Sequence, residues 1–117
     1  MLKKKNSQEA SNKAAEQAAY EQELKDHPLY PVFMSAIHQV MYGKGERHGG
    51  GKIPFMDQDW VRLGQAHGRG FLTGQACKKI TEAAETRHGT DFEIEMLGAI
   101  VYAGMAVIHE RNRDGEQ

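Results

Sequence analysis

The segment from Phe92 to about Arg111 constrains the fold more than any other part of this chain, because its apolar residues recur at helical spacing. Two neighbouring lines at that spacing are apolar: Ile94, Leu97, Val101, Gly104 and Ile108, and beside them Met96, Ile100, Ala103 and Val107. Together the two lines cover more than half of a helix's circumference. We therefore expect this segment to be the central, largely buried helix of the protein.

Other segments also predict helices, and none of comparable length has the alternation of a strand. The second expected helix begins near Pro31, and its apolar face should cover Leu97, Val101, Gly104 and Ile108. A third should start with Asp57 as its N-cap, break at His67–Gly70, and be followed by a fourth over Phe71–Thr86. Leu72, Ala76, Ile80 and Ala83 or Ala84 of that helix should face inward. The pattern predicts an all-α fold, a small helical bundle of about four to five helices with a Gly-rich basic loop between the second and third.

A polar helix is expected at the start of the chain, over Ser7–Asp26, where alanines supply most of the apolar positions. Such a thin apolar stripe indicates either a solvated arm or a contact within an oligomer. His27–Pro31 interrupts it, because proline disfavours a helical conformation of the preceding residue. We predict an N-terminal helix or arm over residues 1–27, a helical core domain over 28–112 and a disordered tail over 113–117.

Composition narrows the classes of protein that fit. The 117 residues suffice for one modest core, and 15 basic against 16 acidic residues give a formal charge of −1. That balance excludes general affinity for polyanions. One cysteine excludes an intrachain disulfide. The sequence shows neither a membrane span nor a signal peptide, and the expected location is the cytoplasm.

The basic Gly-rich loop over Gly43–Lys52 is the first candidate binding site. Successive glycine amides can form a nest for phosphate oxygens, with basic side chains beside it. A second basic Gly element, over Gly64–Gly74, could converge on the same ligand. The candidate ligand-binding residues are Lys44, Arg47, His48, Lys52, His67 and Arg69. The alternatives are a plain flexible connection for the loop and close helix packing for the second element.

Carboxylates around the last helical hairpin are the second candidate site. Glu82 and Glu85 share one face near the end of their helix, and Glu93 and Glu95 begin the next helix, which must run back alongside. Such a cluster could hold Mg²⁺ between itself and substrate phosphates. The alternative is a set of solvated glutamates at helix ends.

Several segments resemble the all-α nucleotide pyrophosphohydrolases, the MazG-like group. They are the loop residues from Lys44 to Gly49, Trp60, KKITEAAE at 78–85 and EIEMLGAIVYAGM at 93–105. The resemblance implies a helical bundle, often dimeric, with an E-x-x-E pair on one helix and an E-x-x-D pair on the next. These pairs bind Mg²⁺ for cleavage of nucleoside triphosphates to monophosphate and pyrophosphate. Glu82 and Glu85 match the first pair and Glu95 opens the second, while Gly98 stands at the position of the final aspartate.

Two functional hypotheses follow. In the first, the chain binds a nucleotide or another phosphate-bearing ligand, as a Mg²⁺-dependent pyrophosphohydrolase or as a degenerate, non-hydrolytic relative encoded by a phage. In the second, it is a non-enzymatic accessory protein of a virus or mobile element, which inhibits a host protein complex or sequesters a signalling nucleotide. Whether it is an enzyme stays open at this point, and a homo-oligomer without membrane contact is expected.

Overall fold

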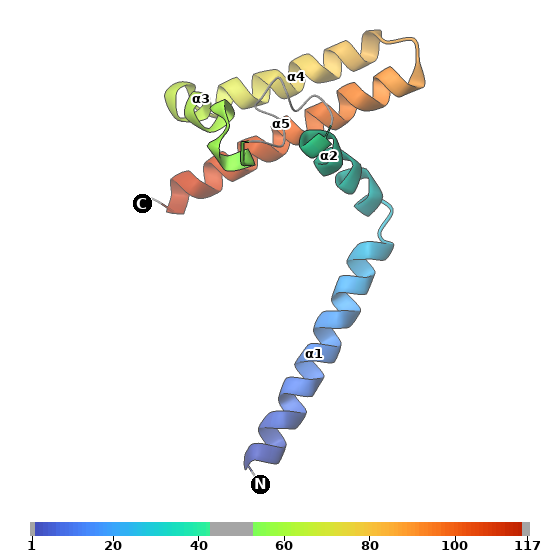
Figure 1. Ribbon diagram of the computed structural model, residues 1–117, viewed down its shortest axis with the longest axis vertical. Coiled ribbons are helices and arrows are strands. Elements are labelled where there is room, and N and C mark those ends of the chain that lie inside the picture. Colours follow the sequence, from blue (N-terminus) through green and yellow to red (C-terminus); the bar gives the residue numbers. More distant parts are fainter. Residues whose placement is uncertain (1, 43–52, 116–117) are drawn as a thin grey trace. The chain divides into compact units, whose positions relative to one another are not determined.

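The structure, a computed structural model, describes residues 2–42 and 53–115 and contains only helices there (Figure 1). The α-helices are α1 (Leu2–Asp26), α2 (Tyr30–Tyr42), α3 (Asp59–His67), α4 (Arg69–Glu85) and α5 (Gly89–Gly115), and a 3₁₀ turn, η3 (Phe55–Asp57), precedes α3. The predicted all-α class is confirmed, and so is the expected number of helices. The Gly-rich loop lies outside the described residues.

The chain divides into two compact units, Met1–Val32 and Phe33–Gln117. In the first unit, α1 exposes every side chain described from Asn6 to Asp26. Its last turns carry side-chain hydrogen bonds at i,i+4 spacing, from Gln17 to Glu21 and from Gln22 to Asp26. Local propensity and such pairs account for this helix, which begins earlier than the predicted Ser7.

The second unit is built on an antiparallel hairpin of α4 and α5, with α3 packed beside them (Figure 1). Leu72 of α4 is fully buried between Trp60 of α3 and Met105 of α5. The Trp60 indole also donates a hydrogen bond of 2.9 Å to the Phe55 carbonyl oxygen, which fixes η3 against this core.

The predicted inward face of α4 is partly correct. Leu72 and Ala83 are buried and Ala76 is half-buried, but Ile80 is 50% exposed. The prediction for Ile80 is wrong because α5 covers α4 along one side only, and nothing in the described residues covers the side on which Ile80 lies.

A glycine separates α3 from α4, as the sequence predicts. Gly68 has φ +79°, a conformation that side chains with a Cβ rarely adopt, and its amide closes the end of α3 by donating to the Gly64 carbonyl oxygen at 2.7 Å. The predicted N-cap of α3 is wrong, since Asp57 ends η3 and Gln58 precedes the helix.

Helix α5 is longer than predicted at both ends. It begins at Gly89 instead of Phe92, so Thr90 and Asp91 lie inside its first turn and do not precede it. It continues to Gly115, so Arg113, Asp114 and Gly115 are helical, whereas a disordered tail was expected from residue 113. Alternating charges in the last turns, such as Glu110 with Arg113 at 3.7 Å, account for this extension.

The predicted contact between α2 and α5 forms, with less burial than expected. Ala36 of α2 is buried, and the Gln39 side-chain amide donates a hydrogen bond of 3.0 Å to the Ile94 carbonyl oxygen. On α5, Leu97 is buried, Val101 and Ile108 are half-buried and Gly104 is exposed. The prediction therefore holds for Leu97 and is wrong for Gly104.

Gly89–Arg113, within α5, is long and apolar enough to cross a membrane by length and composition alone. The sequence predicts no membrane span, so this helix meets a criterion that was not anticipated. A core helix of a soluble protein that meets the same criterion is mostly buried, whereas 17% of the qualifying window of α5 is buried here. On one side α5 packs along α4, and Glu95 in its second turn pairs with Lys79.

Candidate functional site

A cluster of three charged residues joins α4 to α5 near the turn of the hairpin. The Lys79 ammonium lies 3.3 Å from the Glu82 carboxylate on the same helix and 3.2 Å from the Glu95 carboxylate on α5. We refer to Lys79, Glu82 and Glu95 as the Lys79 cluster. Its position follows from the antiparallel hairpin, which places the end of α4 beside the beginning of α5 (Figure 1). Two of the three predicted metal ligands, Glu82 and Glu95, thus meet at one cation.

Two of the three residues of the Lys79 cluster are largely shielded from water, while the Glu82 side chain is 37% exposed. The side chains of Lys79 and Glu95 are only 19% and 17% exposed. Burial of Lys79 by itself disfavours its charge, but hydrogen bonds and charge attraction from Glu95 and Glu82 outweigh this effect and raise its pKa above the ordinary value. Lys79 is therefore a cation at neutral pH.

Gly98 makes room for Lys79. A Cβ atom added at Gly98 would lie 3.4 Å from Cδ of Lys79, so the lysine stem crosses the helix surface where a larger residue would project a side chain. The structure thus places the stem of Lys79 on α4 directly beside Gly98 on α5.

The third predicted metal ligand is not part of the cluster. Glu85 is the exposed last residue of α4 and, in the described part of the chain, forms no ion pair. Within residues 2–42 and 53–115 no three His, Cys, Asp or Glu side chains come close enough together to share a metal ion. A metal at the Lys79 cluster would thus rely on Glu82 and Glu95, with water and ligand oxygens completing its shell, as Mg²⁺ commonly allows.

The predicted ligand residues His67 and Arg69 lie together at the junction of α3 and α4. Arg69 opens α4 and reaches the Glu110 carboxylate at 3.4 Å, and Arg113 approaches the same carboxylate at 3.7 Å. This end carries a local excess of positive charge. Arg69 precedes Lys79 by ten residues of helix, which corresponds to about 15 Å. A single ion or phosphate group cannot bridge that distance, so the two charged sites contact different parts of any common ligand.

Four predicted phosphate-binding residues lie outside the described residues: Lys44, Arg47, His48 and Lys52. Their role stays a prediction.

An apolar groove beside α2 was not predicted. It has a volume of about 700 Å³, and none of the described residues that line it is acidic or basic. We call it the α2/α5 groove; it is lined by Phe33, Ala36, Ile37, Val40, Met41, Tyr42, Ile53, Pro54, Phe55, Gln58, Ile100, Val101, Gly104, Met105 and Ile108. The sequence signal was present in α2, which contains no Asp, Glu, Lys or Arg. The sequence predicts that the apolar face of α2 belongs to the core, and it does not predict an open groove.

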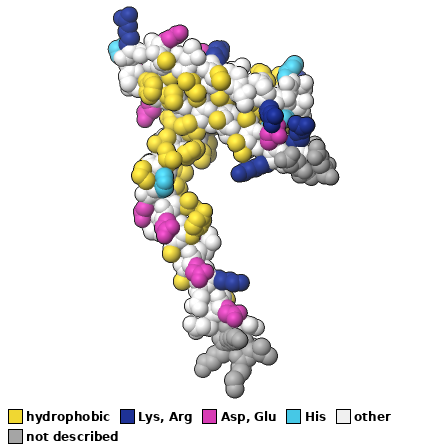
Figure 2. Space-filling view, turned by 180° about the vertical axis from the view of Figure 1, so that it is seen from behind, with side chains coloured by type: hydrophobic (Ala, Val, Ile, Leu, Met, Phe, Trp, Pro, Cys, Tyr) yellow, Lys and Arg dark blue, Asp and Glu magenta, His cyan; other side chains and the backbone are white. Residues whose placement is uncertain are grey.

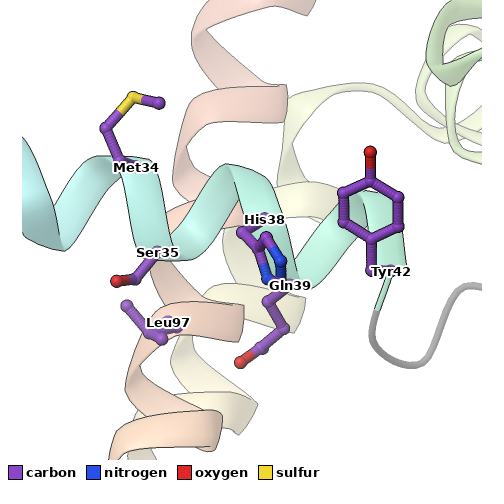
Figure 3. A pocket seen from close by; sticks show the side chains of 6 residues that line it. All are labelled: Met34, Ser35, His38, Gln39, Tyr42 and Leu97. Carbon is purple, nitrogen blue, oxygen red and sulfur yellow. The ribbon is translucent and has the colours of Figure 1, made fainter.

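The other flank of α2 has a more polar hollow of about 610 Å³. Figure 3 shows Ser35, His38 and Gln39 of α2 around it, with Leu97 of α5 beside them. The His38 and Tyr42 rings lie 4.9 Å apart on this side. On this side the Gln39 side chain donates to the Ile94 carbonyl oxygen and so ties α2 to α5.

Comparison of the chain with known protein families, with characterised proteins and with solved structures gave no match.

Proposed function

We propose that this chain is a small helical protein that binds a nucleotide or another phosphate-bearing ligand, with a Mg²⁺ site at the Lys79 cluster. One observation carries the proposal: carboxylates from two helices converge on one cation, within 3.3 Å for Glu82 and 3.2 Å for Glu95. Carboxylate oxygens are ligands that Mg²⁺ prefers, and Mg²⁺ is commonly held by one or two of them together with substrate phosphates.

The charge of the cluster makes phosphate binding dependent on metal. The two carboxylates and the Lys79 ammonium sum to one negative charge, and Lys78, which is 66% exposed and 3.8 Å from Glu82, offsets it, so the group has no net positive charge to attract a phosphate. A bound Mg²⁺ would make the local charge positive. Because Lys79 occupies the place between the two carboxylates, Mg²⁺ has to displace its ammonium, and binding is weakened by the ion pairs that are lost.

This competition separates a hydrolase from a binding protein. If Mg²⁺ displaces the ammonium at cellular concentrations, the ion can stabilise charge that develops on phosphate oxygens and support pyrophosphohydrolysis. If Lys79 retains its place, the chain binds its ligand through the basic residues without turnover. Lys44, Arg47, His48, Lys52, His67 and Arg69 are the residues proposed to neutralise the phosphates. Such a protein would act in the cytoplasm, where nucleotides are available.

The test is a thermal-unfolding series on the full chain with nucleoside triphosphates, with and without Mg²⁺. A ligand that binds the folded state raises Tm by mass action. Lys79→Met keeps an unbranched apolar stem but removes the competing cation, so it should enlarge the Mg²⁺-dependent rise in Tm. Glu82→Gln and Glu95→Gln should abolish that rise, and pyrophosphate release measured in parallel reports turnover.

Glu93→Gln is the matched control, because Glu93 is exposed on α5 two residues before Glu95 and does not belong to the cluster. It should respond to Mg²⁺ as the parent does. Lys44→Ala and Arg47→Ala should weaken nucleotide affinity, measured by calorimetry, and the loss should shrink at high salt. The proposal would be refuted if nucleotide with Mg²⁺ changed the Tm of neither the parent chain nor the Lys79→Met variant.

A second candidate function is a non-enzymatic protein that binds and inhibits a host protein complex. It is favoured by apolar side chains on α2 that stay about half exposed, namely Phe33, Ile37 and Met41. Exposed apolar patches of this kind mark interaction sites. Capture of a foreign protein by the wild-type chain, lost on Ile37→Glu, would support this candidate.

A further inference from the structure

Helix α2 has the composition of a buried helix and the exposure of a surface helix. Phe33, Ile37 and Met41 are 50%, 52% and 49% exposed. Hydrophobic side chains gather over α2 and the adjoining part of the hairpin in Figure 2. Soluble monomers rarely leave so many large apolar residues together in water. Something therefore covers this surface.

The α2/α5 groove has this exposed ridge as one of its walls, because Phe33, Ile37 and Met41 also line the groove. Residues of α5 line it opposite, and a Cβ added at the exposed Gly104 there would meet nothing within 4 Å. None of the described residues that line the groove is charged. An apolar ridge thus borders an apolar hollow on the same unit of the chain.

Charge restricts the occupant. An acidic or basic side chain that entered the groove would lose water without gaining a counter-ion, which costs several kcal/mol in practice. A fitting partner needs an apolar ridge that is uncharged over about the 20 Å length of a 13-residue helix. Helix α2 meets that requirement itself, and two identical uncharged surfaces meet without like-charge repulsion.

The area also fits a second copy. A whole aromatic side chain can bury about 150–250 Å², so a half-exposed large side chain presents on the order of 100 Å² of surface. Six such side chains therefore offer about 600 Å² per copy. The six are Phe33, Met34, Ile37, Met41, Tyr42 and Ile53. A standard interface covers about 800 Å² on each partner. Five of the six residues already line the groove, so the remainder has to come from its α5 residues, such as Ile100 and Ile108.

We infer that this chain forms a two-fold symmetric dimer in which the α2 ridge of each copy packs into the α2/α5 groove of the other. The inference is independent of nucleotide binding, because the Lys79 cluster contributes nothing to this surface. Burial of the ridge would complete a core that, in the described residues of one copy, has only Leu72 fully buried among its large side chains.

The experiment is sedimentation equilibrium, with light scattering, on the full chain without ligand. The wild type should have twice its sequence mass of 13.1 kDa. Ile37→Glu places a charge in the contact and should raise the dimer Kd by about 100-fold. Ile80→Glu is the matched control, since Ile80 is the same residue type, is 50% exposed on α4 and does not line the groove. It should dimerise as the wild type does.

A second variant keeps the result interpretable if Ile37→Glu folds poorly. Gly104→Leu projects a side chain into the open groove, where an added Cβ meets nothing within 4 Å inside one copy, and it improves helix propensity, so it should weaken the dimer while helical circular dichroism is retained. A wild-type monomer up to the solubility limit overturns the inference. So does a dimer that survives both Ile37→Glu and Gly104→Leu, or a monomer whose α2 binds lipid vesicles or another protein instead.

Discussion

The stem of Lys79 on α4 lies against Gly98 on α5, so that a Cβ added at Gly98 would stand 3.4 Å from Cδ of the lysine. This contact brings any side chain placed at position 98 next to the Lys79 cluster. A short side chain fits at position 98, because the nearest atoms belong to the flexible side chain of Lys79. If that new side chain were charged, its charge would act directly on the Lys79 cluster.

Gly98→Asp should therefore strengthen the response to Mg²⁺. The new carboxylate would stand beside Glu95 on the same helix and add a third oxygen ligand, which hard divalent cations favour. Isothermal titration with Mg²⁺ measures the effect, and Gly98→Asn, which has the same size without the charge, is the control. Equal affinities in the two variants would show that the cluster is not a metal site.

Lys79→Met should lower the free energy of unfolding at neutral pH by about 1–3 kcal/mol, between the values for exposed and for buried ion pairs. The folded-state pKa of Lys79 is raised, so the contribution of its charge is complete below the unfolded-state pKa of about 10.4 and is lost as pH rises through the folded-state value. Urea unfolding between pH 7 and pH 11 should show the difference between parent and variant narrowing only in the alkaline range.

Leu72→Ala should destabilise the second unit by about 2–5 kcal/mol, because the residue is fully buried between α3 and α5 and leaves a cavity. Ile80→Ala, on the same helix but half exposed, should cost much less. Denaturant titration followed by Trp60 fluorescence reports both. Similar losses for the two variants would mean that the inward face of α4 is assigned incorrectly.

Gly68→Ala should lower the free energy of unfolding by about 1–3 kcal/mol, because Gly68 has φ +79°, a conformation in which residues with a Cβ are strained. Gly70→Ala is the matched comparison, because Gly70 is helical and nothing lies within 4 Å of a Cβ added there. This change should raise the free energy of unfolding by about 0.5–1 kcal/mol. Opposite shifts of Tm are expected, and shifts of the same sign would contradict the break between α3 and α4.

Helical periodicity and helix-breaking residues were enough to predict the architecture of this protein from the sequence alone. The apolar lines of α5, Pro28 after α1 and Gly68 between α3 and α4 act over a few residues, and local steric effects suffice to predict them. Helix ends were less predictable. Thr90 and Asp91 can cap a helix or lie in its first turn, and only the path of the hairpin decided that α5 begins at Gly89.

Tertiary structure alone decided which apolar faces are covered and which charges meet. Periodicity identifies a face on α2 but carries no information on what stands opposite, so Ile37 and Gly104 were expected in a core and lie at an open groove. The approach of Glu82 and Glu95 could be anticipated from the hairpin. The lysine between them could not, because the contact of Lys79 with Glu95 depends on how α4 and α5 pack, with the lysine stem lying across Gly98.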